Sequence, residues 1–296
     1  MREAVLAMAY GTPERLEDVE AYYTHIRRGS PPPEPLLDEL VERYREVGGP
    51  TALNRITRRQ AQSLEEELGR RGRELPVYVG FKHHPPFVGE VVGEMADDGI
   101  ERAVGLVLAP HYSLRSIAEY EEYAEAARPE GMEIDTIRSW HDDPAFVDFL
   151  VERLEEALGR VEAEPMVLFT AHSVPSAVLE RGDPYPEQLR ESAGAIASRA
   201  GVERWRLAYQ SAGRTPEPWL EPDILDVIED LAEEGEEAVV VQPVGFVSDH
   251  LEVLYDIDIE AREAAESRGM AFARTGMPND HPDFVAALAD VVERAL

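Results

Sequence analysis

Segments typical of β-strands alternate with longer segments typical of helices along almost the whole chain of 296 residues. This alternation constrains the fold strongly, because strands separated by helices form parallel sheets joined by right-handed crossovers. We therefore predict an α/β protein with two similar Rossmann-like halves, each a four-stranded parallel sheet flanked by helices, and a cleft between the halves. The expected strands are Ala4–Ala9, Val77–Phe81, Ala103–Ala109 and Glu133–Ser139 in the first half, and Met166–Thr170, Arg206–Gln210, Ala238–Pro243 and Ala271–Arg274 in the second.

Two domains of ordinary size fit a chain of this length, of which 44% is hydrophobic. The segment Trp140–Pro144 separates the two series of strands and is the expected boundary. A last helical segment, Pro282–Ala295, is expected to fold back onto the first half. The predicted domains are therefore residues 1–141 together with 277–296, and residues 142–276. Helices are also expected at Asn54–Gly72 and near 186–200, 221–234 and 250–268.

The charge and the lack of cysteine exclude several classes of function. Sixty acidic residues against 29 basic ones give a formal charge of −31, which argues against binding to nucleic acid or to an anionic membrane surface. Without cysteine the chain has no disulfide, zinc–thiolate site or cysteine-ligated iron–sulfur cluster, so a metal would need His, carboxylate or Tyr ligands. No apolar stretch is long enough to span a bilayer and no leader-peptide pattern is present, so a cytoplasmic location is expected.

Polar residues follow many of the predicted strands. In open parallel sheets ligands bind at the carboxyl ends of strands, so these positions are the first candidates for a site. The dinucleotide, P-loop, serine-hydrolase and zinc-protease motifs are missing, and the adjacent His172 and Ser173 diverge too much to form a nucleophile and its base. The candidate segments are AYGTP (Ala9–Pro13), GFKHHPPF (Gly80–Phe87), LAPHYS (Leu108–Ser113), TAHSVP (Thr170–Pro175) and PVGFVSDHLE (Pro243–Glu252).

A row of acids follows the last of these segments. Glu252, Asp256 and Glu260 recur every four residues, which places them near one face of a helix. Like charges at this spacing repel by about 0.2 to 0.5 kcal/mol per pair, so helix stability gives no reason for the row. No Lys or Arg between Asp249 and Ala261 neutralises it. The row is either a solvated face of a very acidic protein or a carboxylate track for a divalent metal.

Basic residues gather in one short segment between the first strand and the helix that begins near residue 54. YYTHIRRG and RYREVGG contain Arg27, Arg28, Arg43 and Arg45 among aromatic residues. The guanidinium fork suits carboxylates, and aromatic rings suit flat molecules. The cluster is either ordinary helix-surface charge or the binding site of a flat, anionic ligand.

The motifs that carry these features resemble those of the ferrochelatase family. They occur in that family's order and approximate spacing from about Val5 to Val292, and the resemblance is greatest to the Gram-positive, cytoplasmic branch that inserts iron into coproporphyrin III. It implies a chelatase-like fold and a lyase that needs no organic cofactor. The motifs are MAYGTP, YYTHIRRG, the GG before Pro50, LAPHYS, AHSVP, GDPYPEQL, SAGRTPEPWLEPD and PVGFVSDHLEVLYD.

The resemblance also implies roles for individual residues. His172 and Glu252 would handle ferrous iron and the pyrrole protons on one face of the macrocycle, with Asp256 and Glu260 as an acidic ridge for incoming metal. Tyr10 matches a tyrosine that approaches the metal from the other face, where relatives that use protoporphyrin usually carry Met or Leu. His83 matches a cleft histidine without a defined role. The predicted contacts to the substrate propionates are Arg27, Arg43, Thr51, Ala52 and Tyr120.

Three departures from the family pattern are visible. Thr51 and Ala52 stand where Ser–Pro is typical, His84 and Pro85 replace a common Ile–Glu, and the acidic excess is larger than usual. The Ser-to-Thr change keeps a hydroxyl donor, so we expect it to be mild. Of the other histidines, we predict His111 to be a structural hydrogen-bonder and leave His250 open, while His25, His141 and His281 are expected at the surface or as helix caps.

The implied partners are coproporphyrin III and ferrous iron, both as substrates, with no iron–sulfur cluster and no membrane insertion. A monomer is the expected state, with transient partners possible for delivery of iron and collection of product. Three alternatives stay open: a protoporphyrin IX ferrochelatase, a cobalt or nickel chelatase of the same fold class, and a carrier that binds porphyrin or haem without catalysis.

Overall fold

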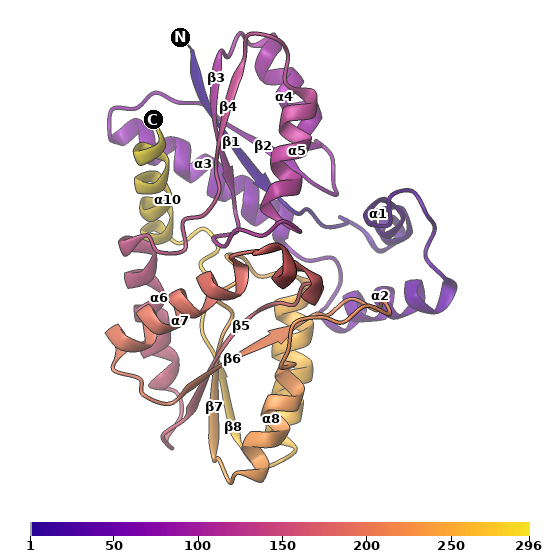
Figure 1. Cartoon of the computed structure of the whole chain (residues 1–296), viewed down its shortest axis with the longest axis vertical. Helices are drawn as coiled ribbons and strands as arrows, with labels where there is room; N and C mark the ends of the chain where they lie inside the picture. The colour runs from indigo at the N-terminus through magenta and orange to yellow at the C-terminus, as the bar shows by residue number, and fades with distance from the viewer. Residues whose placement is uncertain (1) are drawn as a thin grey trace.

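Two parallel sheets form the centre of the protein. The computed structural model describes residues 2–296, and within them eight strands make two four-stranded sheets (Figure 1). The order is β2-β1-β3-β4 in the first sheet and β6-β5-β7-β8 in the second, so the two halves repeat one topology, and the predicted α/β architecture is confirmed. The strands are β1 (Glu3–Ala9), β2 (Val77–Phe81), β3 (Arg102–Val107), β4 (Glu133–Ile137), β5 (Met166–His172), β6 (Trp205–Gln210), β7 (Ala238–Gln242) and β8 (Ala271–Arg274).

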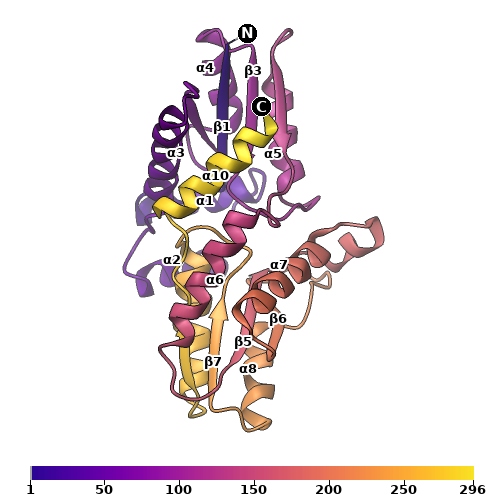
Figure 2. The same cartoon turned by 90° about the vertical axis from the view of Figure 1, so that its left-hand side faces the viewer.

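Helices connect the strands and cover the sheets. Figure 2 shows α10 crossing beside the first sheet and α6 continuing beside the second. The helices are η1 (Leu16–Asp18), α1 (Val19–Ile26), α2 (Glu34–Glu46), α3 (Leu53–Arg70), α4 (Val88–Asp97), α5 (Ile117–Ala127), α6 (Pro144–Leu158), η2 (Ser176–Arg181), α7 (Tyr185–Ala200), α8 (Ile224–Glu233), η3 (Val253–Ala261), α9 (Arg262–Glu266) and α10 (Pro282–Ala295). No helix in residues 2–296 is long and apolar enough to cross a bilayer.

Central strands are apolar on both faces because helices cover both sides of each sheet. Six of the seven residues of β1 are buried, and all five residues of β7 are buried. The edge strand β4, by contrast, contains no buried residue, and its side chains are more polar than those of β1 and β7. This pattern places the most hydrophobic strands in the middle of each sheet and leaves their carboxyl ends free for polar loops.

Helix α10 joins the two halves. It packs against α3, which covers the first sheet, and against α6, which covers the second. Phe284 of α10 is fully buried, with its ring centroid 6.1 Å from that of Trp140 and 5.8 Å from that of Phe146. The final helix therefore contacts both halves. The domain boundaries given above stay a prediction.

The acidic row lies on an unusual helix. A helix was predicted near residues 250–268, and the structure contains one, but its first part, η3, is a π-helix of nine residues that passes into α9. Most π-helices are single-turn bulges, and they occur frequently at functional sites. Val253, Ile257 and Ala261 are fully buried, and Ile257 and Ala261 belong to an apolar cluster with residues of β7 and α8. The acids of the row each precede one of these apolar anchors by one position.

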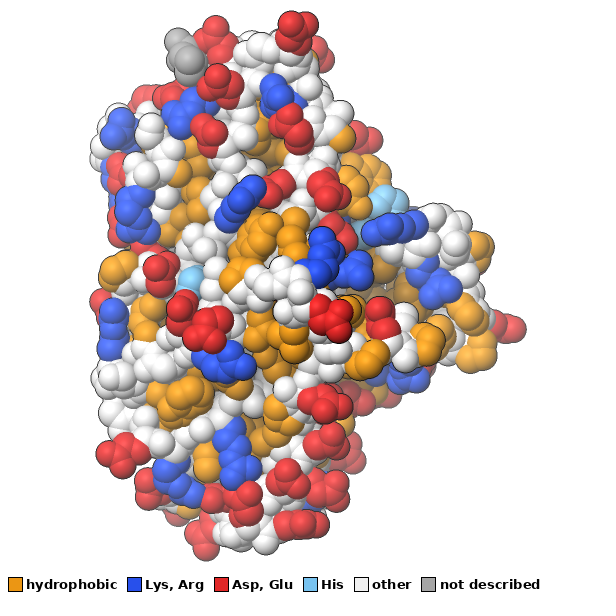
Figure 3. Space-filling model, viewed as in Figure 1, with side chains coloured by type: hydrophobic (Ala, Val, Ile, Leu, Met, Phe, Trp, Pro, Cys, Tyr) orange, Lys and Arg blue, Asp and Glu red, His pale blue; other side chains and the backbone are white. Residues whose placement is uncertain are grey.

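Helices α1 and α2 project from the body of the molecule. Figure 1 shows them together on one side, level with the space between the two sheets. They carry the arginines predicted to bind carboxylates. Figure 3 shows acidic side chains over both halves, whereas several Lys and Arg side chains gather near the base of this projection.

Candidate active site

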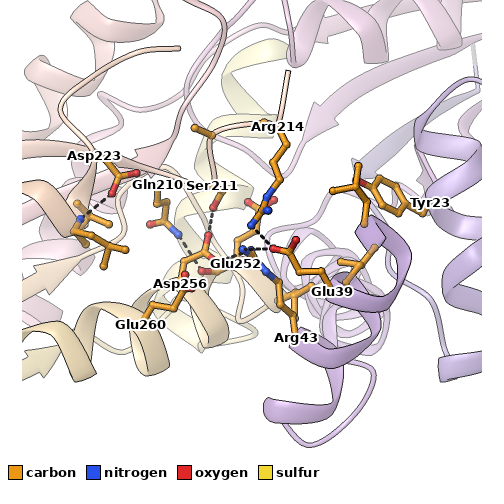
Figure 4. Close-up of a pocket in the computed structure, with 17 residues that line it drawn as sticks. Tyr23, Glu39, Arg43, Gln210, Ser211, Arg214, Asp223, Glu252, Asp256 and Glu260 are labelled. Atoms are coloured by element: carbon orange, nitrogen blue, oxygen red, sulfur yellow. Dashed lines mark hydrogen bonds and ion pairs between the residues drawn. The ribbon is translucent and has the colours of Figure 1, made fainter. Parts of the chain in front are cut away.

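Two neighbouring cavities lie where the carboxyl ends of the strands meet the projecting helices. The larger has a volume of about 330 Å³ and the smaller about 170 Å³. Both are lined by Tyr23 and Leu40 from the projection and by Leu251 and Glu252 from the loop before η3. Figure 4 shows the larger cavity, into which acidic and basic side chains from both halves point. Glu252 therefore stands where the two cavities meet.

His172 and Glu252 form an ion pair. His172 is the last residue of β5 and Glu252 immediately precedes η3. The distance between His172 Nε2 and Glu252 Oε1 is 3.4 Å, and the two side chains are 37% and 32% exposed. Close packing of the loop after β7 makes this approach possible, because a Cβ on Gly245 would lie 2.6 Å from the Cβ of Ala171. The predicted pairing of these two residues is thus present in the geometry.

Both members of the pair are charged at neutral pH. Burial lowers the pKa of His172, but the adjacent Glu252 carboxylate outweighs burial and holds that pKa above its ordinary value. Burial likewise raises the pKa of Glu252, but the charges of His172 and His250 outweigh it and hold that pKa below the usual range. The resting site is therefore an imidazolium beside a carboxylate, and a metal must displace the proton before it can bind the imidazole.

Neighbouring groups orient both members of the pair. Nδ1 of His172 contacts the carbonyl oxygen of Ser173, which can only accept, so Nδ1 carries a proton and Nε2 is the nitrogen available to a metal. The hydroxyl of Tyr185 donates to the His172 carbonyl at 3.0 Å. Nε2 of Gln210 donates to the Glu252 carbonyl at 3.0 Å. These contacts hold the backbone of both residues in place.

His250, which the sequence left open, belongs to the site. Its Nε2 lies 3.6 Å from Oε2 of Glu252, so Glu252 faces one imidazole with each carboxylate oxygen. The motif DHLE contained the signal, since it places a histidine two residues before the predicted Glu252, in the segment that follows β7. Nevertheless, no three His, Asp or Glu side chains in residues 2–296 already form a cluster able to hold a metal ion.

Asp256 and Glu260 continue from Glu252 along the wall of the larger cavity. Asp256 is only 5% exposed, which excludes a merely solvated acidic face. Ser211 donates a hydrogen bond to its carboxylate, and Nη1 of Arg43 lies 3.4 Å from Oδ1. Burial and the Glu252 charge together raise the pKa of Asp256 to about 7, against the opposing effects of Ser211 and Arg43. Burial also raises the pKa of Glu260.

Tyr10 faces the same space from the other half of the protein. It follows β1 directly, is 42% exposed, and lines the smaller cavity together with Glu252. Its ring packs edge-on against His83, with centroids 4.6 Å apart. Burial and the Glu252 charge raise the pKa of Tyr10 above its ordinary value, so the free protein holds a neutral phenol there. A ligand in the smaller cavity would thus lie next to both Tyr10 and Glu252.

The predicted carboxylate-binding residues occupy different positions around the cleft. Arg43 lines the larger cavity, but it already contacts two carboxylates, Glu39 at 3.2 Å and Asp256 at 3.4 Å. Arg27 ends α1, is exposed, and has no carboxylate within 4.0 Å among residues 2–296. Thr51 has a buried hydroxyl without a hydrogen-bond partner in the described chain, and Ala52 immediately precedes α3. Arg27, Thr51, Ala52 and Tyr120 line neither of the two cavities.

Lys82 is a site residue that the sequence reasoning missed. It directly follows β2, is 8% exposed, and its Nζ lies 2.5 Å from Oε2 of Glu119. The ammonium lies 5.8 Å from the ring centroid of Tyr10 and 5.4 Å from that of Tyr120, which is itself buried. The signal was its place in GFKHHPPF, one of the segments at strand ends. Because buried lysines are rare, the sequence alone did not indicate a buried position for this lysine.

The remaining histidines divide into confirmed and wrong predictions. His111 is a structural hydrogen-bonder, with Nε2 2.8 Å from Ser192 Oγ, and His281 caps α10 by accepting from the Asp283 amide. The expectation of a surface or capping position is confirmed for His25, which is exposed, and wrong for His141, which is buried. Nδ1 of His25 lies 3.0 Å from Nδ1 of His83, and buried His141 lies 2.9 Å from Glu191. Chain folding brings these partners from distant segments, which local sequence cannot reveal.

Comparison with known proteins agrees with this geometry. The sequence model described as Ferrochelatase matches residues 2–296. The coproporphyrin III ferrochelatase of Geobacillus sp. (strain WCH70) is 47% identical over 297 residues, with 97% of this chain and 96% of that protein covered. The coproporphyrin III ferrochelatase of Bacillus subtilis (strain 168) is 45% identical over 301 residues, with 99% and 97% covered.

Solved structures show the same fold at low sequence identity. SirB from Bacillus subtilis with Fe³⁺ has a TM-score of 0.61 at 13% identity, covering 99% of this chain and 95% of that one. CbiX, the terminal enzyme for biosynthesis of sirohaem in denitrifying bacteria, has a TM-score of 0.59 at 15% identity and covers 99% of both chains. These likenesses concern the fold, whereas the full-length sequence match places the chain in one family. The chain belongs to the ferrochelatase family of metal chelatases.

Proposed function

We propose that this protein is a coproporphyrin III ferrochelatase, a lyase that inserts Fe²⁺ into coproporphyrin III and releases two protons. The observation that carries the proposal is the His172–Glu252 ion pair, of which Glu252 lines the smaller cavity together with Tyr10. Relatives named coproporphyrin III ferrochelatase, 45% and 47% identical over nearly the whole chain, support the choice of substrate. The reaction forms iron coproporphyrin for haem synthesis, and we place it in the cytoplasm in a monomeric protein.

Substrate binding begins with the flat tetracarboxylate entering the cleft. Arg27 has no carboxylate partner of its own in the described chain, so its guanidinium is free to bind a propionate. Arg43 must exchange at least one of its two present carboxylates for a propionate. The hydroxyls of Thr51 and Tyr120, with the backbone at Ala52, are the further predicted contacts. Binding energy from these contacts offsets the strain of bending the macrocycle.

Metal insertion then needs a base and a ligand on one face. Glu252 is ionised and accepts a pyrrole proton, while His172, once it has lost its own proton, presents Nε2 to the metal. Asp256 and Glu260 supply carboxylates along the route from the larger cavity, and oxygen and nitrogen donors of this kind suit Fe²⁺. Two pyrrole protons leave as one Fe²⁺ enters, and they pass to bulk water together with the proton that His172 releases and later regains, so the charge balances. The proposed reaction requires no organic cofactor and no iron–sulfur cluster.

Tyr10 has a separate role on the other face. Its neutral phenol does not compete for Fe²⁺ in the free protein, because burial and the Glu252 charge disfavour the phenolate. After insertion, the positive iron centre lowers the cost of deprotonation, and the phenolate can bind the product iron. Tyr10 therefore acts in product binding more than in insertion.

The test is anaerobic metallation followed by absorbance, with Fe²⁺ and either coproporphyrin III or protoporphyrin IX. Rapid turnover with coproporphyrin III alone is the expected result. Turnover with protoporphyrin IX alone would contradict the substrate but keep the chemistry of the pair. Binding without turnover of either porphyrin would make the protein a carrier, although a carrier has no use for Glu252, Asp256 and Glu260. Preference for a cobalt or nickel ion would identify a different metal chelatase.

A further inference from the structure

The loop between β7 and η3 determines where Glu252 lies. It carries His250 and Glu252 into the cleft, and its own polar anchor is Asp249, one residue before His250. Asp249 does not line either cavity and does not contact His172. Its carboxylate instead accepts hydrogen bonds from Arg274 and Asn279, which lie at and after the end of β8.

Arg274, the last residue of β8, contacts this loop and the π-helix at once. Its Nε and Nη2 donate to the two carboxylate oxygens of Asp258, at 2.7 and 2.8 Å, and Nη2 also lies 3.2 Å from Oδ1 of Asp249. Asp258 lies within η3, whereas Asp249 precedes Glu252. The Arg274 side chain is only 14% exposed, so these are strong, weakly screened contacts.

Asn279 completes the anchor from the segment after β8. Its Nδ2 donates to Oδ2 of Asp249 at 2.7 Å, and its Oδ1 accepts from the Asp249 amide at 2.8 Å. Asn279 has φ of +46°, a left-handed conformation that asparagine tolerates better than most residues. Gln60 of α3 in the first half donates to the Asn279 carbonyl at 2.7 Å and to Ser248 Oγ at 3.1 Å. The anchor thus connects the loop with both halves of the protein.

We propose that Arg274 is a positioning residue for the metallation site. Arg274 fixes the position of Glu252 relative to His172, because it binds Asp249, which precedes Glu252, and Asp258, which follows Glu252. This inference rests on the proposed function and deepens it. Glu252 is bracketed by these two anchors, so its main chain can shift little while both contacts hold. Neither Arg274 nor Asp249 touches substrate in this arrangement, and both act through Glu252.

Arginine suits this role better than lysine does. Its planar fork binds both oxygens of Asp258 and still reaches Asp249, whereas a lysine ammonium is a point charge on a flexible stem. Geometric precision matters here because a displacement of about 1 Å caused by a change far from the reacting atoms can cost about a hundredfold in rate. Loss of Arg274 should therefore appear in kcat, while porphyrin binding, which depends on the other side of the cleft, should change little.

The experiment compares Arg274→Gln, Arg274→Lys and Asp249→Asn with the wild-type protein in anaerobic metallation of coproporphyrin III. We expect Arg274→Gln to lower kcat by about ten- to a hundredfold with KM for the porphyrin within about twofold. Arg274→Lys should recover part of kcat. Asp249→Asn keeps the Arg274–Asp258 contact and should lower kcat by less than Arg274→Gln does.

A second readout does not depend on turnover. The ring carbon resonance of His172 at one fixed pH reports its contact with Glu252, and Arg274→Gln and Asp249→Asn should move it toward its position in Glu252→Gln. If the wild type proves inactive, the proposed reaction fails, yet this resonance still tests the anchor. If Arg274→Gln does not fold, the kcat and the His172 resonance of Asp249→Asn test the proposal instead.

Arg102 offers a matched control in the other half. It is 19% exposed, begins β3, and contacts two carboxylates, Glu3 and Asp135, each at 3.0 Å, far from the carboxyl ends of the strands. Arg102→Gln should lower stability without changing kcat or the His172 resonance. The proposal is overturned if the Arg274 and Asp249 variants behave like Arg102→Gln, losing stability while kcat and the resonance stay at wild-type values.

Discussion

Nη1 of Arg43 lies 3.4 Å from the buried carboxylate of Asp256, so one guanidinium belongs both to the predicted propionate site and to the acidic row that leads to Glu252. Figure 4 shows the two side chains meeting across the cavity from opposite halves of the chain. In the free protein Arg43 is therefore already paired with a carboxylate. A propionate must compete with Asp256 for the Arg43 guanidinium.

This competition predicts opposite effects of two substitutions on porphyrin affinity. Arg43→Gln removes a charge-assisted contact worth about 1.5 to 3 kcal/mol. Part of this free energy only compensates for the Asp256 contact that Arg43 gives up when the propionate binds. The Kd for coproporphyrin III should therefore rise about tenfold. Asp256→Asn should lower that Kd by a few fold, because Arg43 loses a competitor. Fluorescence quenching of the porphyrin measures both. Arg45→Gln is the control, since within residues 2–296 exposed Arg45 pairs only with exposed Glu42 on the same helix. Tighter binding by Arg43→Gln would contradict the role of Arg43.

Glu252→Gln should separate binding from chemistry. The amide keeps the shape of the side chain but cannot accept a pyrrole proton, so we expect turnover to fall by about 10² to 10⁴ while the Kd for coproporphyrin III stays within about twofold. Stopped-flow absorbance gives the rate, and fluorescence quenching gives the affinity. An equal loss of binding would mean that Glu252 is structural.

Metal binding at the pair should depend on pH in a defined direction. The pKa of His172 is raised, so the imidazole carries a proton at neutral pH and loses it as the pH rises through that pKa. A metal needs the neutral ring, so affinity for a probe ion such as Zn²⁺ should increase with pH by up to about tenfold per unit below that pKa. Calorimetry in buffers of different ionisation enthalpy should detect a proton released per ion bound.

Glu252→Gln provides the check on that pH dependence. Without the carboxylate, burial dominates and the pKa of His172 should fall below its ordinary value. The variant should then bind Zn²⁺ more weakly, with little proton release at pH 7. Equal proton release from the variant and the wild type would contradict the assigned cause of the shift.

Tyr10→Phe should affect the product more than the reaction. The phenol is neutral in the free protein and takes no part in proton removal, so kcat should stay within a few fold. Bound iron coproporphyrin should lose the absorbance of a phenolate ligand and dissociate faster. Phe keeps the ring that packs against His83, which makes the hydroxyl the only difference. An unchanged product spectrum would exclude Tyr10 as an iron ligand.

Phe284 should contribute strongly to stability. Its ring is fully buried between aromatic rings of the segment that joins the halves, and Phe→Ala at such a position costs about 3 to 5 kcal/mol. Urea unfolding measures the loss of free energy. Asp283→Ala, at the exposed neighbouring position, should change it by less than about 0.5 kcal/mol. A small effect of Phe284→Ala would mean that α10 is not an essential part of the core.

The fold followed from the sequence because the apolar strand segments are distinct. Predicted Val77–Phe81 and observed β2 coincide, and Ala238–Pro243 differs from β7 by one residue. The π-helical form of η3 was not predictable, since a spacing of four residues fits an α-helix almost equally well. Nothing local in the sequence distinguishes the two, because the difference depends on how Val253, Ile257 and Ala261 are buried in the folded protein.

The site was only partly visible for a similar reason. The motifs indicated His172 and Glu252 as site residues, and in the structure Nε2 of His172 lies 3.4 Å from Oε1 of Glu252. The pairing of Arg43 with Asp256, and of His25 with His83, depends on contacts between segments far apart in the chain, which no local pattern encodes. Lys82 was missed because its partner Glu119 comes from α5.

One apolar cluster contains Val5 and Leu106 of the first sheet as well as Val167 and Phe169 of the second, with α10 between them. The two halves therefore cannot lose their packing independently, and heating should melt the molecule in a single cooperative transition rather than half by half. A ligand that binds only in the cleft then protects every strand of the protein against unfolding, including those that it never touches.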